Sequence, residues 1–126
     1  MAITPMELVA QARALIKEVS PQAAWDAMSG DVRVLDVRET SEYEAGRVPG
    51  AINIPRGILE FRIGEVAEFA RKDVKIILYC RTGGRAALTT LALNQIGYSN
   101  VSSVTGGIVG WEATGLPVEK DRTQFF

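Results

Sequence analysis

The chain contains no histidine and only one cysteine, Cys80, among its 126 residues. Without histidine, a Cys–His or Ser–His catalytic pair cannot form within the chain, and neither can a zinc or haem site with histidine ligands. A single cysteine excludes an internal disulfide and a Cys-x-x-Cys redox pair. We therefore expect no transition-metal site. Any activation of Cys80 must come from backbone dipoles and arginines.

The sequence also lacks a strong net charge and long apolar runs. The formal net charge of −1 gives no indication of a nucleic-acid or anionic-membrane partner. The apolar runs are far shorter than the roughly 20 residues that a membrane span needs, and the N-terminus lacks the features of a signal peptide. We expect a cytoplasmic protein. The length and the hydrophobic fraction of 47% are typical of one globular domain.

The most informative stretch is residues 76–88, where an apolar run ends at Cys80 and a helical pattern begins at Arg85. The β-branched start predicts a buried strand. Ligands bind in such loops at the carboxyl ends of strands in open α/β sheets, and a helix N-terminus adds positive potential there. We therefore predict a functional loop of the residues Cys80, Arg81, Thr82, Gly83, Gly84 and Arg85.

Strands and helices alternate along the rest of the chain, which predicts a parallel sheet with helices on both faces and right-handed crossovers. We expect the tail from Glu119 onward to fray. The predicted strands are 32–37, 51–54, 76–80 and 101–104, and the predicted helices are 5–18, 21–28, a short one from 40 or 41, 57–70, 85–96 and one ending at 113.

The first predicted helix has a complete N-terminal signal: Thr4 as N-cap, Pro5 at the first position and Glu7 completing a capping box. Because this helix precedes the alternating core, we divide the chain into an N-terminal helical extension, residues 1–18, and one domain, residues 19–126. The extension is a candidate docking or homodimer element.

Cys80 has two possible interpretations, one structural and one functional. A free cysteine is commonly a small buried core residue. A cysteine beside arginines at a helix N-terminus is instead favoured as a thiolate, and the surrounding amides could hold a thiolate, a persulfide or a tetrahedral oxyanion. The Gly-Gly pair and the two arginines favour the functional reading. Cys-dependent phosphatases have five residues between cysteine and arginine, whereas four separate Cys80 from Arg85, which favours a smaller cradle.

The loop C-R-T-G-G-R-A at 80–86 resembles the active-site loop of the rhodanese (sulfurtransferase) family. Three further segments are similar to family motifs in the expected order: L-D-V-R-E-T-S-E-Y at 35–43, G-R-V-P-G-A-I-N-I-P at 46–55, and G-G-I-V-G-W at 106–111 followed by G-L-P at 115–117. The resemblance covers residues 18–119. Arg47 stands where the family usually has histidine, a position that we interpret as structural.

The resemblance implies a rhodanese-like α/β fold with a mostly parallel sheet of about five strands. It implies a thiosulfate sulfurtransferase-like enzyme in which Cys80 accepts a sulfane sulfur from thiosulfate or a persulfide and passes it to a thiol or cyanide. No metal or organic cofactor is implied. Arg81 and Arg85 would attract the small anionic donor.

Several side chains around the loop have both structural and functional interpretations. Asp36 could bond the loop amides or pair with Arg38, and we favour the pairing. Arg85 could orient substrate or brace the loop through carbonyls or a carboxylate. Glu42 is expected in solvent or paired with Arg38 or Arg47. Trp25 is expected in the core, and Trp111 is expected in the core or in a pocket wall.

Two other functions are compatible with the sequence. One is a sulfur-carrier or regulatory binding module with low turnover, in which the extension at residues 1–18 docks a partner. The other is a Cys-dependent phosphatase or arsenate reductase, against which the short loop argues.

Overall fold

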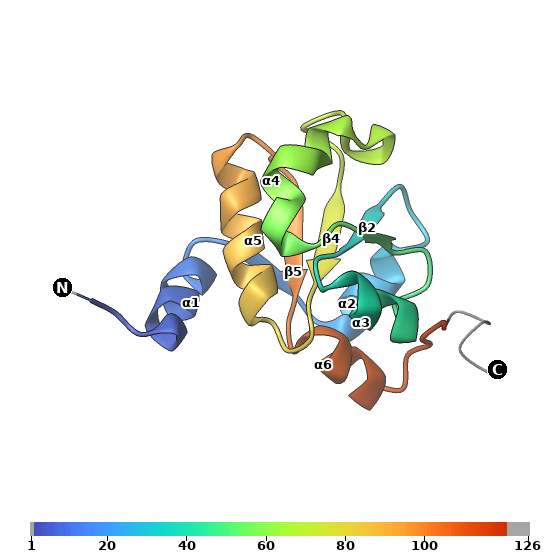
Figure 1. Cartoon of the computed structure of the whole chain (residues 1–126). Helices are drawn as coiled ribbons and strands as arrows, with labels where there is room; N and C mark the ends of the chain where they lie inside the picture. Colours follow the sequence, from blue (N-terminus) through green and yellow to red (C-terminus); the bar gives the residue numbers. More distant parts are fainter. Residues whose placement is uncertain (1, 121–126) are drawn as a thin grey trace.

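A computed structural model describes residues 2–120 of the chain and shows an α/β fold (Figure 1). The strands are β1 (Lys17–Val19), β2 (Arg33–Asp36), β3 (Ile52–Asn53), β4 (Ile76–Tyr79) and β5 (Val101–Val104). The helices are α1 (Pro5–Arg13), α2 (Pro21–Ala27), α3 (Thr40–Ala45), α4 (Leu59–Arg62), α5 (Gly84–Gln95) and α6 (Gly107–Ala113), with 3-10 turns η1 (Arg56–Ile58), η2 (Ile63–Glu65) and η3 (Ala67–Phe69).

The five strands form one sheet in the order β1-β5-β4-β2-β3, and every pair is parallel. The predicted fold class is therefore confirmed. Because all strands run in the same direction, their carboxyl ends meet at one edge of the sheet. That edge carries Asp36 at the end of β2, Cys80 after β4 and Gly106 after β5.

Each face of the sheet packs into its own apolar core. Successive residues of β4 alternate between the two faces. Ile76 and Leu78 join the core under α4 and α5, whereas Ile77 and Tyr79 join the core with α2 and α6. Both cores hold fully buried large side chains, which fixes β4, and hence the start of the Cys80 loop, in the middle of the molecule.

The N-terminal segment differs from the prediction. The capping box of Thr4 and Glu7 is present, but α1 ends at Arg13 instead of residue 18. Residues Lys17–Val19 form the edge strand β1, which pairs with β5. The helical periodicity of this segment is overridden by hydrogen bonds to a neighbouring strand, which a sequence pattern does not reveal.

Two further expectations are corrected. The predicted helix at 57–70 is divided into one short helix, α4, and three 3-10 turns, with Gly64 inside the second turn. Glu119 is not frayed, because it forms an isolated antiparallel bridge with Arg47. The rest of the tail, residues 121–126, lies outside the described residues. Within residues 2–120, no helix is long and apolar enough to cross a membrane.

Candidate active site

Cys80 lies where the sequence predicts it, between the buried strand β4 and the start of α5. The cysteine is 1% exposed, and the next two residues, Arg81 and Thr82, are exposed. Gly83 has a φ of +118°, a left-handed conformation that glycine adopts without strain, and it is the N-cap of α5. Its N–H donates to Cys80 Sγ at 3.0 Å. An amide at a helix N-terminus therefore points at the sulfur.

The first turn of α6 holds the other side of the loop. Ile108 N–H donates to the carbonyl of Cys80 at 2.9 Å, and Val109 N–H donates to the carbonyl of Arg81 at 3.1 Å. In a planar trans peptide, the N–H points opposite to the carbonyl. The amides of Arg81 and Thr82 are therefore directed away from α6, so the α6 contacts set the orientation of two loop amides.

Gly107 allows this close contact. A Cβ at that position would lie 2.4 Å from the carbonyl oxygen of Arg81 and 2.5 Å from that of Cys80. Its φ of +58° is also left-handed. Only glycine fits between the two backbones without displacing one of them.

The guanidinium group of Arg85 forms an ion pair with a carboxylate. Its Nη1 and Nη2 donate to Oε1 and Oε2 of Glu42 at 2.9 and 3.1 Å, a bidentate ion pair. The hydrogen bonds from Arg85 lower the pKa of Glu42 from 4.5 to about 2, assisted by the backbone N–H of Glu39. The expectation that Glu42 lies in solvent or pairs with Arg38 or Arg47 is therefore wrong, and Arg85 braces the loop through a carboxylate.

Asp36 and Arg38 form a buried ion pair behind the loop. The Oδ2 atom of Asp36 accepts from Arg38 Nη2 at 2.6 Å and from the Tyr79 hydroxyl at 2.7 Å. Burial, together with the charge and hydrogen bond of Asp36, raises the pKa of Tyr79. Arg38 also donates to the carbonyl of Gly46 at 2.6 Å. This network fixes the segment that carries Glu42, so Asp36 and Arg38 have supporting, structural contacts.

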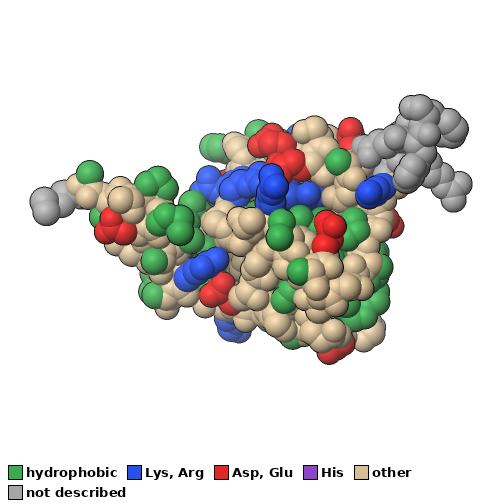
Figure 2. Space-filling view, turned by 90° about the horizontal axis from the view of Figure 1, so that it is seen from below, with side chains coloured by type: hydrophobic (Ala, Val, Ile, Leu, Met, Phe, Trp, Pro, Cys, Tyr) green, Lys and Arg blue, Asp and Glu red, His purple; other side chains and the backbone are tan. Residues whose placement is uncertain are grey.

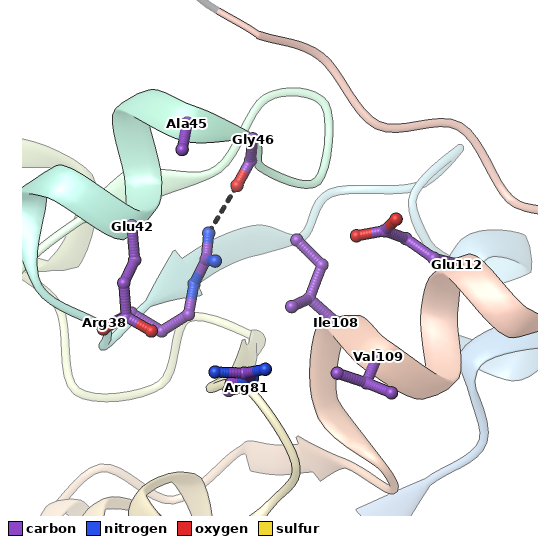
Figure 3. A pocket seen from close by; sticks show the side chains of 8 residues that line it. All are labelled: Arg38, Glu42, Ala45, Gly46, Arg81, Ile108, Val109 and Glu112. Carbon is purple, nitrogen blue, oxygen red and sulfur yellow. Dashed lines mark hydrogen bonds between the residues drawn. The ribbon is translucent and has the colours of Figure 1, made fainter.

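A pocket of about 330 Å³ opens beside the loop (Figure 3). Arg38 and Glu42 line one wall, Ile108 and Val109 of α6 line the other, and Arg81 lies between the two walls. Among the described residues, Arg81 makes no ion pair or side-chain hydrogen bond, so its charge is available to a ligand.

Basic side chains gather on the face that carries α6 and the loop. Seen from below the view of Figure 1, a band of Lys and Arg side chains crosses the surface, with acidic side chains beside it (Figure 2). The net charge of −1 does not reveal this local arrangement. Within the described part of the chain, no group of three or more Cys, Asp or Glu residues could hold a metal ion.

The structure thus brings the predicted loop residues together, with Gly84 half-buried beside α1. Sequence reasoning missed the partner of Arg85 and the role of the α6 amides, although the Gly106-Gly107 pair was a visible signal for a tight turn. Trp111 is buried as expected, whereas Trp25 is 37% exposed and packs edge-on against it, so its assignment to the core is wrong.

Comparisons with known proteins agree with this architecture. The family model of the rhodanese-like domain matches residues 20–114. A sulfurtransferase of Allochromatium vinosum is 34% identical over 88 residues, which cover 70% of this chain and 78% of that protein. The thiosulfate sulfurtransferase GlpE of Actinobacillus succinogenes is 33% identical over 103 residues, covering 81% of this chain and 89% of the relative.

Among solved structures, a Rhodopseudomonas palustris protein superposes with a TM-score of 0.81 and 28% identity. The match covers 94% of this chain and 96% of that protein, which is described as a protein of unknown function and a possible tyrosine phosphatase.

Proposed function

The chain belongs to the rhodanese-like domain family, and we propose that it is a sulfurtransferase that carries a sulfane sulfur on Cys80. The donor is thiosulfate or a persulfide, and the acceptor is a thiol or, in an assay, cyanide. The relatives in Allochromatium vinosum and Actinobacillus succinogenes support this class of reaction by their names. The geometry of the loop supports Cys80 as the carrier.

In the first step, the Cys80 thiolate attacks the outer sulfur of the donor. With thiosulfate, a new S–S bond forms to Cys80, the S–S bond of thiosulfate breaks, and sulfite leaves with the electron pair. The charge is conserved, because the Cys80 thiolate and the thiosulfate dianion become the Cys80 persulfide anion and the sulfite dianion. In the second step, an acceptor thiolate attacks the outer persulfide sulfur, and the Cys80 thiolate leaves.

The observation that carries the proposal is the hydrogen bond from Gly83 N–H to Cys80 Sγ at 3.0 Å. An anion formed at this position lies at the N-terminus of the 12-residue helix α5, where amide dipoles stabilise negative charge. Because Cys80 is the only cysteine, a second thiol cannot take the sulfur within the chain. The acceptor must therefore be a separate molecule.

The same loop argues against a phosphatase. A phosphatase of this loop type needs its arginine to hold phosphoryl oxygens, but both terminal nitrogens of Arg85 donate to Glu42. The Rhodopseudomonas palustris protein with a similar structure is described as a possible tyrosine phosphatase, so phosphatase activity should also be tested. Aryl-phosphate hydrolysis that is lost in Cys80→Ser would support it.

Mass spectrometry of the intact protein tests the proposal. Incubation with thiosulfate should add one sulfur atom, about 32 Da, to the wild type and nothing to Cys80→Ser, because only a thiolate can displace sulfite. Addition of cyanide should remove the adduct and release thiocyanate. An absence of the adduct in the wild type with both thiosulfate and glutathione persulfide would contradict the proposal.

The same experiment separates an enzyme from a sulfur carrier. A sulfur carrier forms the Cys80 adduct but transfers its sulfur atom only once and slowly. A sulfurtransferase completes many cycles of sulfur transfer when donor and acceptor are in excess. The number of thiocyanate molecules formed per Cys80 in a timed assay measures this difference.

A further inference from the structure

We infer that Arg13 of α1, which precedes the family match, is a substrate-binding residue that attracts the anionic end of the sulfur donor toward Cys80. The inference rests on the proposed function for the identity of the ligand. The position of Arg13 against the loop is independent of it. The ligand class is a small anion with a terminal sulfur, such as thiosulfate.

The geometry places Arg13 against the loop. A Cβ on Gly83 would lie 2.9 Å from Arg13 Nη2, and a Cβ on Gly84 would lie 3.8 Å from Cγ2 of Val9, one helical turn earlier on α1. Gly83 N lies 3.0 Å from the Cys80 sulfur, so standard bond lengths put Arg13 Nη2 within about 8 Å of that sulfur. This distance is comparable to the screening length at physiological salt, about 8 Å, so the charge is felt at the sulfur.

Two other arginines near the loop are occupied. Arg38 is paired with Asp36, and Arg85 is paired with Glu42. Among the described residues that line the pocket, the other arginine is Arg81. Arg13 approaches from α1, which packs beside α5 (Figure 1). Arg13 would therefore add a second positive charge near the loop, besides that of Arg81.

Arg13 is able to turn toward a ligand. Its Nε lies 3.7 Å from Oε2 of Glu18, a distance beyond a hydrogen bond, and its side chain is 44% exposed. Exposed ion pairs of this kind contribute little free energy, so exchanging Glu18 for an anionic ligand costs little. Glu18 lies in the edge strand β1, and its carboxylate would compete with the anionic donor for the guanidinium group of Arg13.

Alkylation of Cys80 tests the charge without relying on sulfur transfer. Iodoacetate is an anion and iodoacetamide is neutral, and both react with the thiolate. The ratio of their second-order rate constants therefore measures the potential at the approach to the sulfur. For a charge at about 8 Å, Arg13→Gln should lower the ratio about two- to fivefold, and Glu18→Gln should raise it. Arg13→Lys should stay near the wild-type ratio.

A matched control is Arg71→Gln, because Arg71 is paired with Asp73 before β4, at the opposite edge of the sheet. The ratio of the two alkylation rate constants in Arg71→Gln should equal that of the wild type. The effect of Arg13→Gln on this ratio should become smaller at 1 M salt, where the screening length is about 3 Å. In the sulfur-transfer assay, Arg13→Gln should lower kcat/KM for thiosulfate about three- to tenfold through KM.

The outcomes separate this inference from the proposed function. A lowered alkylation ratio in a protein that takes no sulfur from thiosulfate would retain Arg13 as an anion-attracting residue and reject the sulfurtransferase. A ratio unchanged by Arg13→Gln, equal changes with both reagents, or a thiol that neither reagent reaches would overturn the inference.

Discussion

Glu42 is the side chain whose titration has the clearest consequence for stability. Its pKa is lowered from 4.5 to about 2 in the folded chain by Arg85. A depressed carboxyl pKa stabilises the fold above the unfolded-state value and loses that contribution as pH falls toward the folded-state value. Since both side chains of the pair are about one-third exposed, solvent screening reduces the contribution to about 1 kcal/mol.

We therefore predict that Glu42→Gln is about 1 kcal/mol less stable than the wild type at pH 7 and that the difference disappears between pH 4.5 and about 2. Urea unfolding at a series of pH values measures it. Glu44→Gln, an exposed change on the same helix α3, is the control and should stay within a few tenths of a kcal/mol. A difference that persists unchanged to pH 2.5 would contradict the assignment of the ion pair.

At the residue scale, the sequence predicts contacts that are local and misses those that depend on the fold. Asp36 and Arg38 are two residues apart, and their predicted pairing is confirmed. Arg85 and Glu42 are 43 residues apart, so nothing in the sequence around either one identifies the other. Trp25 is predicted to lie in the core, but it is partly exposed and forms a T-shaped ring contact with the buried Trp111.

The turn between β5 and α6 is the element on which the Cys80 loop depends most. Gly107 has a left-handed φ and would place a Cβ 2.4 Å from the Arg81 carbonyl oxygen. We predict that Gly107→Ala displaces the loop, slows both sulfur uptake and alkylation of Cys80 at least tenfold, and costs more than about 2 kcal/mol of stability, since backbone strain and a steric clash add.

The matched control is Gly115→Ala, which has a similarly left-handed φ of +85° but open space around the new Cβ. It should cost about 1 kcal/mol through strain alone and leave Cys80 reactivity unchanged. Mass spectrometry of the adduct and urea unfolding of both variants provide the measurements. Equal loss of Cys80 reactivity in the two variants would show that strain, and not the contact with the loop, is responsible.

At the element scale, segments with strong local signals were predicted well. The strand before Cys80 and the helix after it were predicted within a residue or two, because a buried β-branched run, a glycine pair and a regular apolar pattern occur in sequence there. The 57–70 segment has a helical pattern, but Gly64 lowers its helix propensity and the chain forms 3-10 turns around it. Residues 17–19 became a strand through pairing with β5, a contact far away in sequence.

At the scale of the whole molecule, the parallel sheet is what assembles the site. Its strand order places β4 between β5 and β2, so the segments that follow these strands bring Gly107 and Glu42 to opposite sides of the Cys80 loop. The edge position of β1 leaves α1 beside α5, where Arg13 reaches the same loop. The alternation of strands and helices predicts the sheet, but the order of its strands follows from packing.

The strand β1 leads to a prediction about where the domain begins. The sequence places the boundary after residue 18, but residues 17–19 cover the edge of β5. Deleting residues 2–14 removes α1 and the contacts of its buried Ala12, and should cost about 1–3 kcal/mol. Deleting residues 2–18 also uncovers β5, and an unpaired edge strand promotes association. We expect the shorter deletion to stay folded and the longer one to be less stable and to aggregate.

Urea unfolding and light scattering of the two truncated chains and the wild type test this prediction. Equal stability of the two truncated chains would support the boundary after residue 18 and contradict a structural role for β1. The molecular masses from light scattering also test the proposal that α1 forms a homodimer contact. The surface of α1 exposes Met6 and Leu8, which could provide such a contact. A wild-type dimer that becomes a monomer on deletion of residues 2–14 would support that contact, and an unchanged mass would reject it.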